Sequence, residues 1–171
     1  ISGNTTLTNK SLVTMPANGY LYLYDTSVFN NTSTGIFDFQ SDAVLSYSGT
    51  AHQFNNTGLI KKSITAGSAQ IQCILINTGT INVESGTLSM NSLTKTFDGG
   101  IYNISNGSGL SLNILTNING TLTGVLNGVF NWNSNISVSG AATLNFTGAN
   151  AVNWNNSSLL GGGNLTNEST I

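Results

Sequence analysis

The sequence feature that most constrains the fold is a repeat of about 21 or 22 residues. One copy is the stretch Asn77–Met90, in which two short alternating segments are separated by a Ser-Gly pair. Similar phrases begin at Phe54, Ile118 and Gly140. Because a fixed period of this length is typical of stacked repeats, each copy is expected to form one unit that packs against its neighbours.

Apolar residues recur at fixed positions of this repeat. Ile81 and Val83 alternate in one segment and Leu88 and Met90 in the next, as side chains do on one face of a short β-strand. Four columns follow the period: Phe29, Phe54, Ile76, Phe97 and Ile118; Phe39, Ile60, Ile81, Ile101, Leu122, Leu144 and Leu165; Leu88, Leu110, Phe130 and Val152, with Met90, Leu112, Trp132 and Trp154 two residues on; and Ile71, Leu93, Leu115, Ile136 and Leu159.

This pattern predicts an all-β fold, a parallel β-helix (β-solenoid) of roughly eight coils with a period of about 21–22 residues. Strands of successive coils would stack about 4.8 Å apart and bury the columns as ladders, including a contact between Trp132 and Trp154. An antiparallel sandwich is the competing architecture, but it has no reason to keep four columns in phase.

The chain is expected to be one domain, with an irregular N-terminal coil, cap or interface segment at residues 1–28 and the repeats at residues 29–171. Corners are predicted where glycines keep the period, for a positive φ or a close backbone approach: Gly58, Gly79, Gly100, Gly120 and Gly163. Asparagines near the same corners are expected there because they tolerate the left-handed region: Asn55, Asn56, Asn77 and Asn119.

Composition excludes several classes of partner. Only 6% of residues are charged, no arginine is present, and the net charge is −2, so nucleic acid and anionic lipid surfaces are not expected partners. The single cysteine, Cys73, forms no internal disulfide and is predicted to be buried. No apolar run reaches the roughly 18 residues that span a bilayer. The start at Ile1 is interpreted as a mature or excised terminus.

The phrase from Phe54 to Met90, FNNTGLIKKSITAGSAQIQCILINTGTINVESGTLSM, resembles the repeats of secreted bacterial β-solenoid proteins of the adhesin and autotransporter-passenger type. The resemblance covers about 37 residues well and weaker echoes extend to Leu165. It implies an exported surface or matrix protein and brings no catalytic residues. The segment before Phe29 departs from the pattern.

No catalytic or metal constellation is predicted, and the chain is not expected to be an enzyme or to need a cofactor. Acid–base catalysis in such a fold needs a pair of carboxylates, and the repeat brings no such pair to one position. The six carboxylates are therefore interpreted as solvated turn residues: Asp25, Asp38, Asp42, Glu84, Asp98 and Glu168. His52, the only histidine, is expected at an exposed corner. A Thr-x-Thr ladder for ice binding, at Thr78/Thr80 and Thr121/Thr123, is interrupted by Gly99 and Ile101.

Acceptors for N-glycosylation, Asn-x-Ser/Thr, are twice as frequent as the composition predicts. There are 14: Asn4, Asn9, Asn30, Asn31, Asn55, Asn103, Asn106, Asn119, Asn135, Asn145, Asn155, Asn156, Asn164 and Asn167. A densely glycosylated surface would explain the excess, and so would a repeat that copies one Asn-Asn-Thr corner without any sugar.

The sequence therefore predicts an extracellular or cell-surface protein with a structural or adhesive role, which acts as a rigid rod or fibre subunit. Neither terminus offers a capping helix, so end-to-end self-association or continuation in a longer chain is expected. The alternative is a carbohydrate-binding or carbohydrate-active β-helix. Tyr20, Tyr22 and Tyr24 alternate onto one face and are the candidate aromatic contact for such a ligand, or else shield an end coil.

Overall fold

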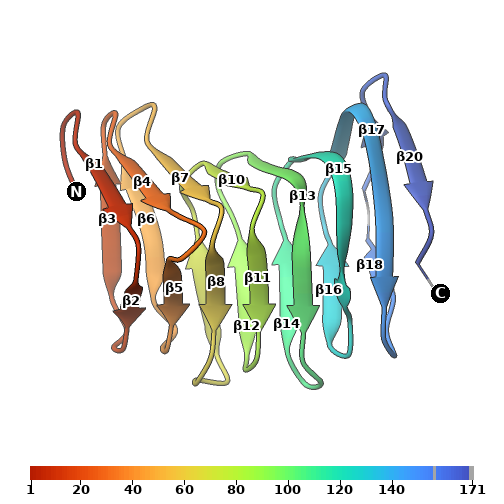
Figure 1. Ribbon diagram of the computed structural model, residues 1–171, viewed down its shortest axis with the longest axis horizontal. Helices are drawn as coiled ribbons and strands as arrows, with labels where there is room; N and C mark the ends of the chain where they lie inside the picture. Colours follow the sequence, from red (N-terminus) through yellow and green to blue (C-terminus); the bar gives the residue numbers. More distant parts are fainter. Residues whose placement is uncertain (156, 170–171) are drawn as a thin grey trace.

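The computed structural model describes residues 1–155 and 157–169. These residues form twenty β-strands and no α-helix, and every strand pairing is parallel. The strands stack side by side in chain order along the long axis (Figure 1). The predicted all-β parallel β-solenoid is confirmed.

Each early coil contributes one strand to each of three faces. The first face holds β1 (Thr6–Asn9), β4 (Val28–Asn31), β7 (Gln53–Asn56) and β10 (Leu75–Asn77). The second face holds β2 (Leu12–Met15), β5 (Ile36–Phe39), β8 (Leu59–Lys62) and β11 (Thr80–Val83). The third face is a separate sheet of β3 (Tyr20–Tyr24), β6 (Val44–Ser48), β9 (Ser68–Ile71), β12 (Thr87–Met90), β14 (Gly109–Leu112), β16 (Val129–Trp132) and β18 (Val152–Trp154).

The first and second faces merge in the later coils. Single long strands replace the paired short ones, namely β13 (Lys95–Ile104), β15 (Thr116–Val125) and β17 (Ile136–Thr147), followed by β19 (Leu159–Leu160) and β20 (Asn164–Asn167). The pairing of β13 with β15 shifts register between Asp98 and Gly100, where Gly99 and Gly100 have positive φ values. A glycine-containing bulge therefore bends one strand around the corner that earlier coils turn with a loop.

The third face has seven strands, so the solenoid has about seven coils, close to the roughly eight expected. The early coils are longer than the average period, since β4 pairs Val28 with Gln53 and β3 pairs Tyr20 with Val44. The same longer spacing explains why residues 1–28 depart from the regular period. They form β1, β2 and β3, which pair in register with β4, β5 and β6, and therefore continue the stack.

Two columns differ by one residue from the prediction. Leu75, not Ile76, stacks on Phe54, and Tyr102, not Ile101, stacks on Ile81. Leu75 and Tyr102 are fully buried, whereas Ile101 is exposed. In both cases two apolar residues are adjacent, and the alternation of a strand turns only one of them inward. In the second column Phe37, not Phe39, stacks on Ile60, and Ala142, not Leu144, pairs with Leu165.

The corner asparagines do not use the left-handed region. Among the described non-glycine residues, positive φ values occur at Asp25, Ala51 and Ser92. Asn55 and Asn56 instead end strand β7, and Asn77 ends β10. Close backbone approach, the other prediction for the corners, is confirmed at Gly79, where a Cβ atom would lie 2.3 Å from the Gly58 carbonyl oxygen.

We predict that Gly79→Ala destabilises the protein, because the neighbouring coil leaves no space for the added methyl group. The free energy of unfolding should fall by about 1–3 kcal/mol, the usual cost of overpacking. Gly19→Ala is the matched control, since no atom lies within 4 Å of the position that its Cβ atom would take and its φ is not positive. That control should be neutral or slightly stabilising in urea denaturation. Equal midpoints for the two variants would contradict the close approach.

Candidate functional site

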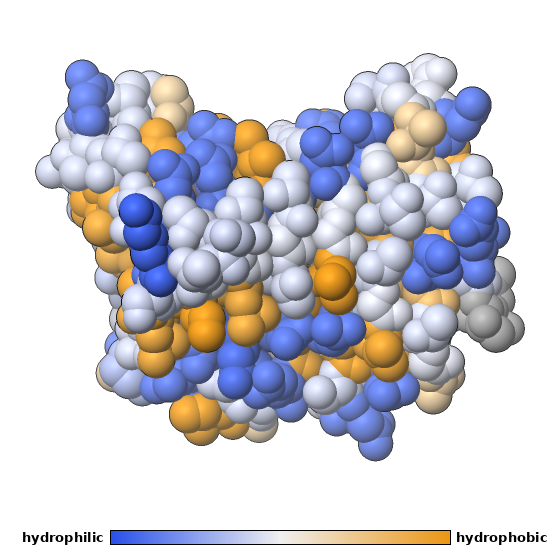
Figure 2. All heavy atoms as spheres, viewed as in Figure 1, coloured by the Kyte–Doolittle hydropathy of each residue, from blue (hydrophilic) through white to orange (hydrophobic). Residues whose placement is uncertain are grey.

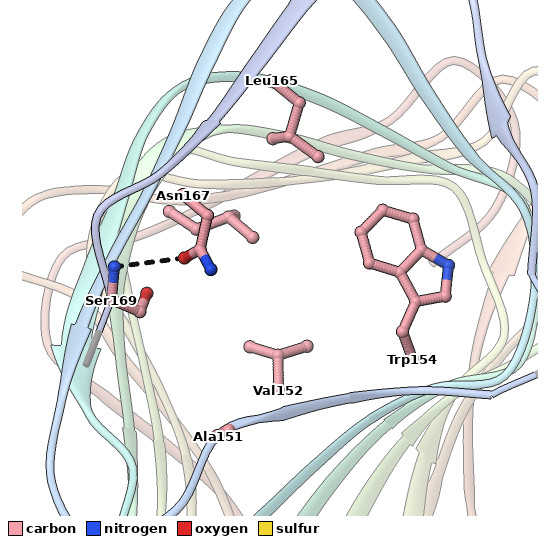
Figure 3. Close-up of a pocket in the computed structure, with 7 residues that line it drawn as sticks. Ala151, Val152, Trp154, Leu165, Asn167 and Ser169 are labelled. Atoms are coloured by element: carbon pink, nitrogen blue, oxygen red, sulfur yellow. Dashed lines mark hydrogen bonds between the residues drawn. The ribbon is translucent and has the colours of Figure 1, made fainter. Parts of the chain in front are cut away.

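The C-terminal end of the stack is an open hydrophobic hollow. Val152, Trp154 and Leu165 point toward one another across the interior of the last coil (Figure 3). The hollow has a volume of about 130 Å³, close to the roughly 150 Å³ of an apolar protein cavity that can bind benzene. Beneath it, Trp154 contacts Trp132 edge to face with a centroid separation of 5.6 Å, which confirms the predicted contact. The last described coil therefore leaves apolar side chains facing this hollow.

The N-terminal end has a similar character. Strands β1, β2 and β3 each pair on one side only, and Val13, Met15, Pro16 and Leu21 line a groove beside Tyr20. The Ile1 amine donates to the carbonyl oxygen of Tyr22. Among the described residues, seven of the eleven exposed large hydrophobic side chains lie on the first or last coil: Leu7, Leu12, Tyr20, Tyr24, Trp154, Leu159 and Leu160. Along the sides, hydrophobic and hydrophilic residues are interspersed, as Figure 2 shows for one view.

An inner amide ladder crosses the first coils. The Nδ2 atom of each asparagine donates to the Oδ1 atom of the next, from Asn9 to Asn31 (2.8 Å), from Asn31 to Asn56 (2.6 Å) and from Asn56 to Asn77 (2.6 Å). Asn77 then donates to the Tyr102 hydroxyl at 3.0 Å, and Tyr102 donates to the Gly99 carbonyl oxygen. All five side chains are buried. The ladder satisfies polar groups that would otherwise be costly inside the core.

A second amide ladder lies on the outside of the third face. Asn155 donates to Asn133, Asn133 to Asn113, and Asn113 to Asn91, at 2.8–3.1 Å. Asn91 in turn donates to Gln70, which lies in the neighbouring row, at 3.1 Å. Because an amide has two N–H donors and two acceptor lone pairs, each member of the row keeps hydrogen-bonding capacity for solvent or a ligand.

The interior corner that precedes the strands of the first face holds side chains of the types that act as nucleophiles and bases. Ser27, His52 and Cys73 each lie two residues before an inward residue of the first face, and all three are buried. The prediction that His52 is exposed is wrong: it is 1% exposed and stacks on Tyr47, with 4.5 Å between ring centroids. Burial lowers the pKa of His52, with a smaller effect from the Lys95 charge, and raises the pKa of Cys73 to about 12.

This corner therefore holds a neutral thiol and a neutral imidazole at pH 7. The two His52 ring nitrogens have no hydrogen-bond partner among the described residues, so no bond to the Cys73 sulfur activates the thiol. The burial predicted for Cys73 is confirmed. The described residues include no group of three or more His, Cys, Asp and Glu side chains that could hold a metal ion.

Two lysines are fully buried, which the sequence did not predict. Lys95 Nζ donates to the carbonyl oxygens of Cys73 and Asn91, each at 2.9 Å, and to that of Leu93. Lys62 Nζ donates to Thr65 and lies 3.6 Å from Asp42. Burial lowers the pKa of both lysines, in Lys95 to about 8, and the charge of Asp42 partly opposes the effect in Lys62. Both ammonium groups therefore stabilise turns by hydrogen bonds from the inside of the solenoid.

The carboxylates are not assembled into a cleft in the described structure. Asp42 pairs with Lys62, and Glu84 pairs with Lys61 at 3.1 Å. The expectation of solvated turn positions is wrong for Asp38, which is buried in β5 and accepts a 3.3 Å hydrogen bond from Gln40. The threonine ladder considered for ice binding is interrupted as expected. Ile101 lies between Thr80 and Thr123 in the stack, because it pairs with Thr80 on one side and with Thr123 on the other.

The structure divides the glycosylation acceptors by exposure. Asn9 and Asn31 are buried members of the inner ladder, with their Nδ2 atoms engaged. Three acceptors are half-buried: Asn30, Asn55 and Asn103. Eight are exposed: Asn4, Asn106, Asn119, Asn135, Asn145, Asn155, Asn164 and Asn167. Asn156 lies outside the described residues.

The tyrosine strip lies on the outer surface of β3. Leu21 and Leu23 turn toward the core, and Tyr20, Tyr22 and Tyr24 turn outward with centroids 5.6 Å apart. Tyr20 is 64% exposed.

Comparison with protein-family models, curated proteins and solved structures finds no significant match to this chain. No helix able to span a bilayer occurs among the described residues.

The low pKa of Lys95 predicts a pH-dependent stability difference. Between about pH 8 and pH 10.5 the unfolded chain retains the Lys95 proton while the folded protein loses it, so this residue makes the unfolding free energy rise with pH. The maximal slope is about 1.4 kcal/mol per pH unit. Burial of Cys73 and Tyr102 raises their pKa values and acts in the opposite direction at high pH, in the wild type and in a Lys95 variant alike.

The measurement is urea denaturation of wild type and Lys95→Met from pH 7 to pH 10.5. The difference in unfolding free energy between the two should grow in favour of the wild type above pH 8. Lys10→Met, at an exposed position, is the control and should leave the wild-type pH profile unchanged. A constant difference between wild type and Lys95→Met across this range would contradict the assignment.

Proposed function

We propose that this protein is an extracellular structural or adhesive rod, which acts as a rigid segment of a longer fibre or surface protein. The observation that supports it is the pair of open ends. Strands β1–β3 at one end and β18–β20 at the other each lack a neighbour on their outer side within the described structure. Unpaired strand edges over an apolar interior favour the addition of another coil, from the same chain or from a second copy.

A stiff rod suits the interactions along the coils. The backbone pairing is parallel from β1 to β20, with register shifts at the glycine bulges of β13 and β15, and buried aromatic contacts such as that of Phe29 with Phe54 reinforce it. The inner amide ladder adds directional bonds between coils. Bending such a rod would break many of these contacts together, so the stack is suited to hold partners at a fixed separation.

The cell-surface location rests on sequence features. The phrase from Phe54 to Met90 resembles secreted adhesin repeats, and a surface with so few charges suits weak, multivalent contacts. From that resemblance we propose that the protein is a surface solenoid of this type. In this proposal its work is mechanical and adhesive and is not catalytic.

We predict that the isolated chain associates end to end. Multi-angle light scattering should show a mass that increases with protein concentration. Trp154→Glu places a charge in the C-terminal hollow and should shift the population to monomer, because an unpaired carboxylate would be buried at the contact.

Val129→Glu is the matched control. Val129 is 42% exposed and Trp154 is 41% exposed, but Val129 lies on the side of the rod. This variant should associate like the wild type. A wild-type protein that stays monomeric at high concentration, or equal effects of the two substitutions, would contradict end-to-end contact.

We also propose that N-linked glycans decorate the sides of the rod. The eight exposed acceptors favour this, while Asn9 and Asn31 could be modified only by breaking the inner ladder. Peptide mapping of the protein from its native source should find sugar at exposed positions such as Asn119 and Asn145 and none at Asn31. The bare peptide mass, or a glycan on Asn31, would rule the proposal out.

A further inference from the structure

The third face is free of charge. Its seven strands, from β3 to β18, contain no Lys, Arg, Asp or Glu residue. The ten acidic and basic residues lie on other strands and turns, among them Asp38, Lys61, Lys62, Lys95 and Asp98. An ionic partner that docked on this face would lose hydration without gaining an opposite charge. The face therefore suits an uncharged ligand.

The outer side chains of this face form straight rows along the rod. One row runs Tyr22, Ser46, Gln72, Asn91, Asn113, Asn133 and Asn155. A second runs Tyr20, Val44, Gln70, Ser89, Ser111, Asn131 and Asn153. Steps along a row are about 4.8 Å, and the two rows are about 7 Å apart. Val44 and Ser46 are buried, and beyond them toward the C-terminus the rows form a regular grid of amides and hydroxyls.

The grid has a low region near its middle. Gly109 follows Thr87 and precedes Val129 in a third row, and the missing side chain leaves a shallow groove of about 310 Å³. Ser108, Ser111 and Asn131 add polar groups to its lining. This volume lies at the lower limit of ligand sites, which span about 300–1,000 Å³.

The tyrosine strip lies at the N-terminal end of the same face. Tyr20 and Tyr22 are nearly parallel, with an interplanar angle of 20°, and their hydroxyl-bearing rings offer both an apolar body and a polar tip. Rings, amides and hydroxyls together match a ligand that presents C–H surfaces and many hydroxyl groups. A row of repeated donors and acceptors further favours a linear ligand over a compact one.

We propose that the third face binds a neutral, linear polysaccharide, which lies along the rod with one end against the tyrosine strip and its hydroxyl groups on the amide row. Asn113 and Asn133 each use one N–H and one lone pair within the row, so the remaining ones are available to sugar hydroxyls. This inference goes beyond the proposed rod, since a rod needs no ligand on its sides.

The test is a pull-down with microcrystalline cellulose and chitin as neutral matrices and carboxymethyl cellulose as the anionic one. The wild type should bind at least one neutral matrix and bind the anionic matrix less. The double variant Tyr22→Ala, Tyr24→Ala should lose at least about tenfold in affinity, because two aromatic contacts are removed. Ile101→Ala, on the second face, is the control and should bind like the wild type.

Circular dichroism of each variant establishes that the fold is retained before binding is compared. The proposal fails if neither neutral matrix retains the protein, if only the anionic matrix does, or if the double tyrosine variant binds undiminished. The Trp154→Glu protein could still form dimers that dissociate when Tyr22→Ala and Tyr24→Ala are added. That result would show that the third face binds a second copy of the chain, and it would also overturn the proposal. Light scattering tests end-to-end association independently of ligand binding, so the failure of the proposed function can be distinguished from the failure of polysaccharide binding.

Discussion

Parallel, in-register stacking is the constraint on which the rest of this structure depends. Each residue lies about 4.8 Å from its equivalents in the coils before and after it, so a position must tolerate its own kind as a neighbour. Phe29 on Phe54 and Asn31 on Asn56 satisfy this condition, the first by packing and the second because an amide both donates and accepts. A single coil satisfies neither, which makes the stack the unit of stability.

The same constraint explains the scarcity of charge. Equal charges at one repeat position would repel across each step, whereas uncharged amides and hydroxyls bond to their copies. Several of the charges that remain are paired or enclosed: Lys61 binds Glu84, Lys62 lies near Asp42, and Lys95 is surrounded by carbonyl oxygens. A composition that looks unusual for a folded protein is therefore what a ladder-forming sequence requires, and it leaves the third face neutral.

Period and alternation were sufficient to predict the architecture, since a ladder repeats itself in the sequence. They failed where two residue types competed for one inward position, as with Ile101 and Tyr102. Asn56 shares strand parity with the buried Phe54, a signal that could have predicted the inner ladder, but asparagine was assigned to corners by its usual preference. The environments of His52 and Lys95 depend on neighbours in other coils, which no single repeat specifies.

The most direct test of this account is the cost of breaking the inner ladder at its centre. Asn56→Ala leaves the Oδ1 atom of Asn77 without its donor in the core and should lower the unfolding free energy by about 2 kcal/mol or more. Asn55→Ala, one residue away, removes one 2.9 Å bond to Asn30 on the partly exposed side and should cost under about 1 kcal/mol. Urea denaturation of both variants decides the matter: a larger loss for Asn56 supports the ladder, and equal losses would contradict it.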